Sequence, residues 1–302
     1  MELTIAGPVL YLISFIFLAT PLLIFFFDYR ARGKQQAVGG TVTIPPPTKI
    51  TEIRVYPIKS CRGFKVDKTR LLKTGLELDR QWMFVDAVTM DFLTIRQISK
   101  MTLIDTALTE NDELEVSIRN SQPKVQFTIP AHPSKQWLDK NSKLSEVEIW
   151  GRRVDGYVYP KELTARFSIF FEKEVRLVYK GPTARVLVGN GAPEVLGRTE
   201  STKFADLAPL QIANQKSIDE LNGRLSQIGH EPIGIERFRP NIVVEGETPW
   251  YEDTWKMIKI GEQGKSTTVD VVARCARCQV PNVDPDTAVK DKKQPYVEIV
   301  LE

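Results

Sequence analysis

The stretch ELEVSIR, residues 113–119, alternates apolar and polar side chains with a period of two. Leu114, Val116 and Ile118 hold one set of alternate positions, and charged or hydroxylated residues hold the other. The next stretch, KVQFTIP (residues 124–130), alternates in the same way. Successive side chains of a strand point to opposite faces of a sheet, so this pattern predicts two half-buried antiparallel strands.

Similar but less regular patterns surround these two stretches. Many short strands separated by turns are typical of a barrel or a sandwich. The further predicted strands of this half are EIRVYPI (residues 52–58), RQWMFVDAV (residues 80–88) and SEVEIW (residues 145–150).

Helical patterns enter in the second half of the chain. One helix is predicted to open at Thr164, in TARFSIFFEKE, and to lead into the strand VRLVYKG. A second helix is predicted in SIDELNGRL, where Ser217 and Glu220 have capping-box spacing. Its apolar face holds Ile218, Leu221 and Leu225. The later strands are predicted in RPNIVVEG (residues 239–246) and VDVVARC (residues 269–275). We therefore predict a mainly β chain with some helices (α+β) and a boundary near residues 160–165.

The first residues differ in kind from the rest. Residues 4–27 carry no charge and would span roughly 36 Å as a helix, enough for a hydrocarbon core of about 30 Å. A signal peptide has a shorter apolar region after positive charge, whereas Glu2 precedes this one. We predict a transmembrane anchor over residues 1–28 and a Pro/Gly linker over residues 29–48. Basic residues just after the span place the rest of the chain in the cytosol.

Composition excludes several classes. The net charge of +3 is too small to indicate nucleic-acid binding. Two histidines rule out a His-rich metal site, and three cysteines cannot form a disulfide framework. Unpaired cysteines fit a reducing compartment.

Two of the cysteines lie in CARCQVPNVDPDT, residues 275–287. A redox pair would be expected at a helix start, yet Pro281 and Pro285 follow too closely for a regular helix. A structural zinc site needs four ligands, so beside this pair it would need Cys61 and a distant histidine. The other readings are two inert cysteines, or one thiolate held out to a soft transition metal.

Several basic and polar residues stand at predicted strand ends. Arginine and lysine make charge-assisted hydrogen bonds to phosphate, so these residues would form an anion pocket if they converge. Isolated surface residues are the alternative. The residues are Lys59, Ser60, Arg80, Thr94, Arg96, Arg239 and Asn241.

Two groups of motifs carry a family resemblance. RPNIVVEG followed by CARCQVPNVDPDTA resembles the MOSC domain. VYPIKSCRGFKV, GLELDRQWMFVD and FLTIRQ resemble the β-barrel domain that precedes it. With the anchor, the whole resembles the mitochondrial amidoxime-reducing component family. The resemblance implies a MOSC N-terminal β-barrel domain over residues 49–163 and a MOSC domain, β-barrel-like, over residues 164–302. Because the family's MOSC domain continues further, it also implies that this one is incomplete at its C-terminus.

The resemblance also implies a site. Cys278 would be the protein thiolate on the molybdenum of a molybdenum cofactor (Mo-molybdopterin), and Cys275 a neighbour. Asp284 and Asp286 would cap and fix the loop beside it. Ala208 replaces a serine found in some relatives. The cofactor-binding residues would be Lys59, Ser60, Arg80, Asp206, Arg239, Asn241 and Cys278.

The implied activity is a molybdenum-dependent reduction of N-hydroxylated substrates, such as amidoximes and hydroxylamines, to amines. Electrons would come from a cytochrome b5-type haem protein and its NADH-dependent reductase. The chain would be a single-pass protein in membrane lipid, at the mitochondrial outer membrane rather than the endoplasmic reticulum. The alternatives are a non-catalytic carrier of molybdenum cofactor and a sulfur-transfer protein.

Overall fold

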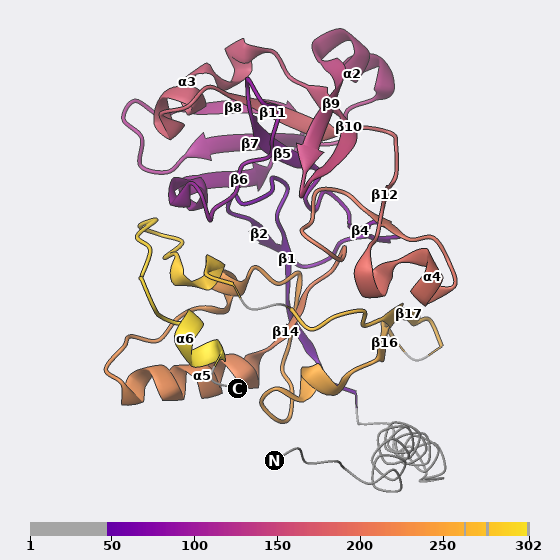
Figure 1. Cartoon of the computed structure of the whole chain (residues 1–302), viewed down its shortest axis with the longest axis vertical. Helices are drawn as coiled ribbons and strands as arrows, with labels where there is room; N and C mark the ends of the chain where they lie inside the picture. Colours follow the sequence, from indigo (N-terminus) through magenta and orange to yellow (C-terminus); the bar gives the residue numbers. More distant parts are fainter. Residues whose placement is uncertain (1–46, 263, 276–277, 301–302) are drawn as a thin grey trace, which may run out of the picture. The chain divides into compact units, whose positions relative to one another are not determined.

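The two alternating stretches of the first half form antiparallel strands, as predicted, and belong to a three-stranded meander. It consists of β6 (Ile104–Leu108), β7 (Glu113–Ile118) and β8 (Gln126–Pro130) in that order. Leu114 and Val116 on β7 are fully buried. The computed structural model describes residues 47–262, 264–275 and 278–300 (Figure 1).

The predicted anchor, residues 1–28, lies outside the described residues, as does nearly all of the predicted linker. Among the residues that the structure does describe, no helix has both the length and the apolar character needed to cross a membrane.

A second antiparallel sheet has the order β5-β11-β10-β9. The side chains of β5 are buried on both faces, which explains why its sequence shows no alternation. Trp82 and Phe84 pack into one apolar cluster, and Met83 and Val85 into another. The strands are β5 (Trp82–Asp86), β9 (Lys143–Ile149), β10 (Arg152–Val158) and β11 (Val175–Lys180).

Helix α3 (Lys161–Phe171) covers one face of this sheet. Phe167 and Phe171 lie 5.9 Å and 5.4 Å from Phe84, measured between ring centroids. The helix starts three residues before Thr164, the predicted start. Pro160 takes the N-cap position, and Thr164 is buried with its hydroxyl donating to Val175 O.

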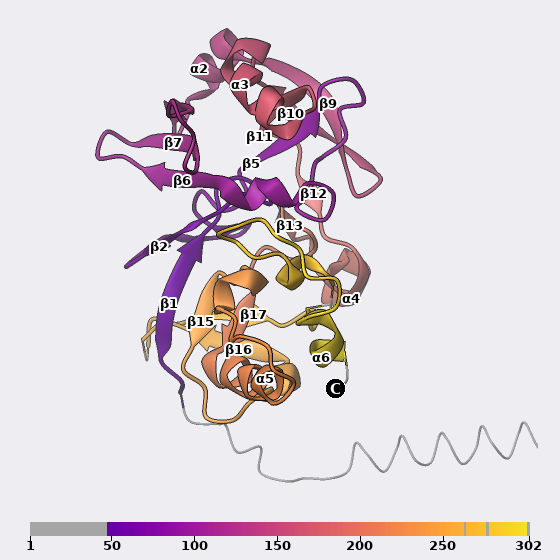
Figure 2. The same ribbon diagram turned by 90° about the vertical axis from the view of Figure 1, so that its left-hand side faces the viewer.

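A third sheet joins the two halves of the chain. Strand β1 (Ile50–Val55) pairs antiparallel with β15 (Ile242–Val244), and β15 pairs parallel with β14 (Ile212–Asn214). The order is β14-β15-β1-β2, with β2 (Phe64–Val66) at one edge. Figures 1 and 2 both show β1 running beside the C-terminal strands. The end of β1 is thereby placed close to the segment that precedes β15.

Helix α5 (Gln215–Gln227) does not begin at the predicted capping box, so that prediction is wrong. Its N-cap is Asn214, whose side chain accepts from Lys216 N. Ser217 lies inside the helix, where its hydroxyl donates to Glu252 and accepts from Trp250 N. The predicted apolar face is confirmed, because Ile218, Leu221 and Leu225 are all buried.

Short elements complete the described part. Strand β17 (Thr267–Asp270) ends five residues before Cys275, so the predicted strand over residues 269–275 extends too far toward the C-terminus. The other α-helices are α2 (Lys135–Asn141), α4 (Pro193–Leu196) and α6 (Tyr296–Val300). The 3-10 helices are η1 (Ser99–Leu103), η2 (Gly189–Gly191), η3 (Ile235–Phe238), η4 (Tyr251–Thr254) and η5 (Val280–Asn282). The other strands are β3 (Leu71–Leu72), β4 (Gly75–Leu76), β12 (Arg185–Val186), β13 (Ser201–Thr202), β16 (Met257–Ile260) and β17 (Thr267–Asp270).

Candidate functional site

A cavity of about 380 Å³ lies where the end of β1 meets the C-terminal half of the chain. The structure brings all the cofactor-binding residues that the resemblance implies to the wall of this cavity, together with Arg96, whereas Thr94 of the predicted anion pocket is not among the lining residues. Their roles toward a ligand stay predictions. The residues are Lys59, Ser60, Arg80, Asp206, Arg239, Asn241 and Cys278.

Lys59 is placed by the turn that ends β1. Its backbone N–H donates to Trp82 O over 2.8 Å, which ties the turn to β5. Ser60 has a positive φ of 66°, a left-handed conformation that reverses the chain here. Lys59 is only 3% exposed, and its ammonium donates to Phe204 O and to the Asp206 carboxylate.

Burial and charge shift both members of this pair. Burial lowers the pKa of Lys59 to about 8, although the Asp206 carboxylate opposes this. Burial would raise the pKa of Asp206, but Lys59 and Arg96 hold it well below its ordinary value. Asp206 also accepts from Trp150 Nε1 over 3.3 Å. The pair is therefore charged at neutral pH.

The indole ring of Trp150 lies close to two cations of this part of the site. Lys59 Nζ lies 5.7 Å and Arg96 Cζ 5.1 Å from its ring centroid. Trp150 has a positive φ of 53° and is 44% exposed. This aromatic residue ties Asp206 to the β9–β10 hairpin.

A second group of cations surrounds Tyr56. Arg80 Cζ and Arg239 Cζ each lie 4.4 Å from the Tyr56 ring centroid. Both arginines have positive φ, 44° and 58°. Arg80 Nη1 donates to both carboxylate oxygens of Asp79 over 2.7 Å, and Arg80 Nη2 donates to Arg239 O. The charge of Arg80 is thus neutralised by a buried carboxylate.

Arg239 has no such partner. Among the described residues it forms no ion pair, and its buried Nη2 has no acceptor. The buried hydroxyl of Tyr56 also lacks a partner there. Burial lowers the pKa of Arg239, and the charge of Arg80 lowers it further. Because buried donors are almost always satisfied, this end of the cavity suits an anionic ligand.

Asn241 differs from the other predicted residues. Its side-chain amide donates to Arg54 O over 3.2 Å and accepts from Gln211 N over 3.2 Å. It is 1% exposed. The amide already holds two backbone segments together, so Asn241 shapes the cavity wall.

Cys278 lies on the segment between β17 and η5. Arg96 Nη2 is 3.6 Å from its sulfur, within the reach of a hydrogen bond to sulfur. Cys275 lines the same cavity and is exposed. Cys61, Cys275 and Cys278 are not joined in a disulfide bond.

The zinc and redox readings of the C-x-x-C motif receive no support from the geometry. Cys61 is buried in the first apolar cluster, where burial raises the pKa of its thiol. Within residues 47–262, 264–275 and 278–300, no three His, Cys, Asp or Glu side chains gather as a metal site. The element after Cys278 is the 3-10 turn η5, not the α-helix of a redox motif.

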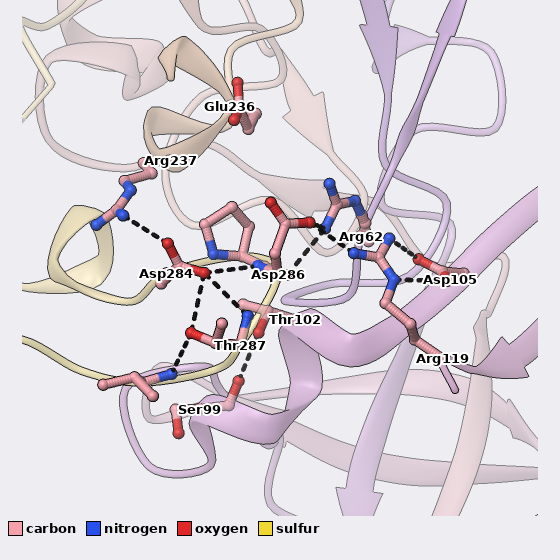
Figure 3. A network of polar contacts seen from close by, with 12 residues as sticks. Arg62, Ser99, Thr102, Asp105, Arg119, Glu236, Arg237, Asp284, Asp286 and Thr287 are labelled. Atoms are coloured by element: carbon pink, nitrogen blue, oxygen red, sulfur yellow. Dashed lines mark hydrogen bonds and ion pairs between the residues drawn. The ribbon is translucent and has the colours of Figure 1, made fainter. Parts of the chain in front are cut away.

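The predicted capping role of Asp284 is confirmed. Its Oδ1 accepts from the N–H groups of Asp286 and Thr287, each over 2.9 Å. Asp286 instead contacts two arginines, Arg62 and Arg119 (Figure 3).

Sequence reasoning missed two residues of the site, Tyr56 and Trp150. Tyr56 lies in the quoted stretch VYPIKS, but an aromatic residue is common in a strand and did not by itself indicate a site. Trp150 precedes Gly151 at a hairpin turn, where exposed tryptophan is unusual. Arg96 was already among the basic residues at strand ends.

Comparison with known proteins completes the picture. The MOSC N-terminal beta barrel domain matches residues 48–174, and the MOSC domain matches residues 199–301. Mitochondrial amidoxime reducing component 2 of Homo sapiens is 32% identical over 276 residues, covering 88% of this chain and 73% of that protein. The chain belongs to the MOSC family.

Other relatives bear two kinds of name. Mitochondrial amidoxime reducing component 2 of Rattus norvegicus is 30% identical over 82% of this chain and 70% of that protein. Molybdenum cofactor sulfurase of Arabidopsis thaliana is 30% identical over 84% of this chain. This MOSC-family chain spans only 31% of the sulfurase. The family and these names point to the molybdenum cofactor.

Proposed function

We propose that this MOSC-family chain binds molybdenum cofactor in the cavity and reduces N-hydroxylated compounds with it. One observation carries the proposal. The thiol of Cys278 and the buried guanidinium of Arg239, whose Nη2 has no hydrogen-bond partner among the described residues, line the same cavity. A soft thiolate suits a transition metal, and a guanidinium suits a phosphate.

The residues present fit such a group. Arg239 Nη2 and Tyr56 Oη are buried polar atoms without a partner among the described residues, as expected where a ligand supplies the acceptor. Arg80 and Ser60 line the same wall. Ser60, Arg80 and Arg239 would hold the phosphate of the molybdopterin, and Cys278 would bind the metal.

When bound, the cofactor supplies a redox centre that accepts and delivers two electrons. The overall reaction balances as R–NHOH plus two electrons and two protons, giving R–NH2 and water. Arg96 stabilises negative charge on the Cys278 sulfur, since its guanidinium lies 3.6 Å away. The same guanidinium contacts Asp206 Oδ2 over 3.3 Å, which fixes its orientation.

Lys59 contributes a proton-bearing group to the wall of the cavity. Its pKa of about 8 lies near neutrality, because burial disfavours the ammonium. Asp206 and Phe204 O hold the nitrogen in place. A residue in this state exchanges protons near pH 7 far more readily than a solvated lysine.

The setting of the enzyme is part of the proposal. The uncharged residues 4–27 and the basic residues after them support a membrane anchor that faces the cytosol. The relatives' names support the mitochondrion. The sequence contains no glycine-rich nucleotide fingerprint, which supports electrons from an external cytochrome b5-type protein and its NADH-dependent reductase.

A second candidate function is binding and delivery of the cofactor, or sulfur transfer, without reduction. The similarity to molybdenum cofactor sulfurase favours it, because that protein's name assigns it a role toward the cofactor itself. Turnover of substrate separates the two candidates.

The test is elemental analysis of the full chain, purified in detergent from a host that makes molybdopterin. We expect about one molybdenum per chain, retained in Cys275→Ala and lost in Cys278→Ala. A test amidoxime with an artificial reductant should be turned over by the wild type. Molybdenum without turnover would favour the carrier function. Zinc, or no metal in folded protein, would overturn the proposal.

A further inference from the structure

The turn after Cys278 carries two carboxylates with different partners (Figure 3). Asp284 closes its own turn through Oδ1. Its Oδ2 accepts from Arg237 Nη2 over 2.7 Å, and Arg237 Nη1 donates to Pro281 O over 3.3 Å. This carboxylate therefore ties the turn to η3, which leads directly to Arg239.

Asp286 reaches the other way. Its Oδ1 accepts from Arg62 Nη1 and from Arg119 Nη1, each over 2.7 Å. Arg62 Nη1 also donates to Pro285 O over 2.8 Å. Arg62 and Arg119 belong to the segment matched by the N-terminal barrel domain, and Asp286 to the segment matched by the MOSC domain. We call these three residues the Asp286 clasp.

Both arginines of the clasp are held from behind by β6. Arg119 donates to both carboxylate oxygens of Asp105, over 3.0 Å and 2.6 Å. Arg62 N donates to Ile104 O over 2.9 Å, and the Thr106 hydroxyl donates to Arg62 O over 2.7 Å. The donors that meet Asp286 are thus preorganised by contacts with one strand.

The clasp and Asp105 together carry balanced charges. Two arginines, Arg62 and Arg119, face two carboxylates, Asp105 and Asp286. The hydrogen bond from Arg62 lowers the pKa of Asp286, against a smaller opposing effect of burial, and Arg119 lowers it further. Asp286 is ionised at neutral pH, yet its side chain is 63% exposed. Exposed ion pairs contribute little to global stability, so the clasp acts locally.

We propose that Asp286, gripped by Arg62 and Arg119, is a positioning residue that holds the segment carrying Cys278 against the cavity. With the clasp closed, Cys278 stays beside Arg96 and only partly accessible. The metal-binding meaning of this position rests on the proposed function. The positioning itself does not, because it concerns a contact within the chain.

The experiment measures thiol labelling in the full chain, prepared in detergent from a host that makes no molybdopterin. Iodoacetamide, which is uncharged, is added briefly, and the protein is then digested with trypsin. Cleavage after Arg274 and Arg277 separates Cys275 from Cys278, so each is quantified in its own peptide. The readout is the ratio of Cys278 to Cys275 labelling. Labelling of the buried Cys61 reports unfolding.

Asp286→Asn is compared with Glu115→Gln, which removes the exposed ion pair between Glu115 on β7 and Lys124. We expect Asp286→Asn to raise the ratio at least threefold and Glu115→Gln to leave it unchanged, with Cys61 unlabelled in both. An unchanged ratio in folded Asp286→Asn would overturn the inference.

A salt series on the wild type gives the answer even if Asp286→Asn does not fold. Raising NaCl from about 0.05 to about 1 M screens exposed ion pairs. The ratio should rise with salt, and a flat ratio would overturn the inference. The outcome is independent of the proposed function, whose failure would show instead as missing molybdenum in protein from the molybdopterin-producing host.

Discussion

Arg96 Nη2 lies 3.6 Å from Cys278 Sγ, although 182 residues separate the two in sequence. The same nitrogen lies 3.3 Å from Asp206 Oδ2. One guanidinium therefore links the cysteine to the Lys59–Asp206 pair. These residues come from different parts of the chain. Substitution of Arg96 therefore tests whether the residues around the cavity act as one site.

Arg96 should matter through its charge and its fork geometry. Arg96→Gln removes the charge beside Cys278, and we expect kcat/KM for a test amidoxime to fall at least about tenfold, ~1.4 kcal/mol. Arg96→Lys keeps the charge and should recover part of the loss. Steady-state kinetics at matched molybdenum content measures this. Equal activity of the Gln variant and the wild type would contradict the role.

Arg80 and Arg239 offer a matched comparison, because each lies 4.4 Å from the Tyr56 ring. Arg239→Met removes a buried charge that has no ion-pair partner among the described residues, so sulfate affinity should fall about tenfold while the melting temperature stays level or rises. Arg80→Met leaves the buried Asp79 carboxylate without Arg80 as its ion-pair partner. This should lower the free energy of unfolding by about 3–5 kcal/mol. Calorimetric titration and thermal unfolding of both variants give the comparison. The reverse pattern would place the anion at Arg80.

Lys59 predicts a pH dependence of anion binding. Its pKa of about 8 means that the ammonium is present below pH 8 and lost as the pH rises through that value. Sulfate keeps its charge across this range, so its affinity should fall roughly tenfold between pH 7 and pH 9. Titration at constant ionic strength checks this, and Lys59→Met should abolish the step.

The same lysine has the opposite effect on folding. Its pKa is lower in the folded state than its ordinary value of 10.5, so the unfolded chain binds more protons between about pH 8 and 10.5. The Lys59 contribution to stability of the ligand-free protein therefore rises with pH across that window. The difference in the free energy of unfolding between the wild type and Lys59→Met, measured by urea unfolding, isolates this contribution. A difference that falls as the pH rises would contradict the assignment.

Phe84 should be a principal determinant of stability in the first apolar cluster. It is fully buried against Phe167 and Phe171. Phe84→Ala should lower the free energy of unfolding by about 3–5 kcal/mol, because a large cavity remains. Val88→Ala, at a side chain that is 84% exposed, should change it by less than about 0.5 kcal/mol. Urea unfolding followed by tryptophan fluorescence measures both.

Local sequence patterns predicted much of the fold. The alternation in residues 113–119 and 124–130 identified β7 and β8, since half-buried strands leave a period of two. It was weaker at β5, where both faces are buried. The start of α5 was misread because Ser217 has the chemistry of an N-cap but is used inside the helix, toward Glu252 and Trp250. Tertiary partners override local capping preferences in such cases.

By itself, the sequence determined which residues could bind an anion and a soft metal, because side-chain chemistry is a property of each residue type. It also determined the mainly β class through the period of its apolar residues. Only the tertiary structure decided that Lys59, Arg239 and Cys278 share one cavity, since the pairing of β1 with β15 brings together residues nearly 200 positions apart. It also decided that Arg80 pairs with Asp79, whereas Arg239 forms no ion pair within the part of the chain that the structure describes. Ion pairing depends on distances of a few ångströms, and these are set by packing between segments that no local pattern records.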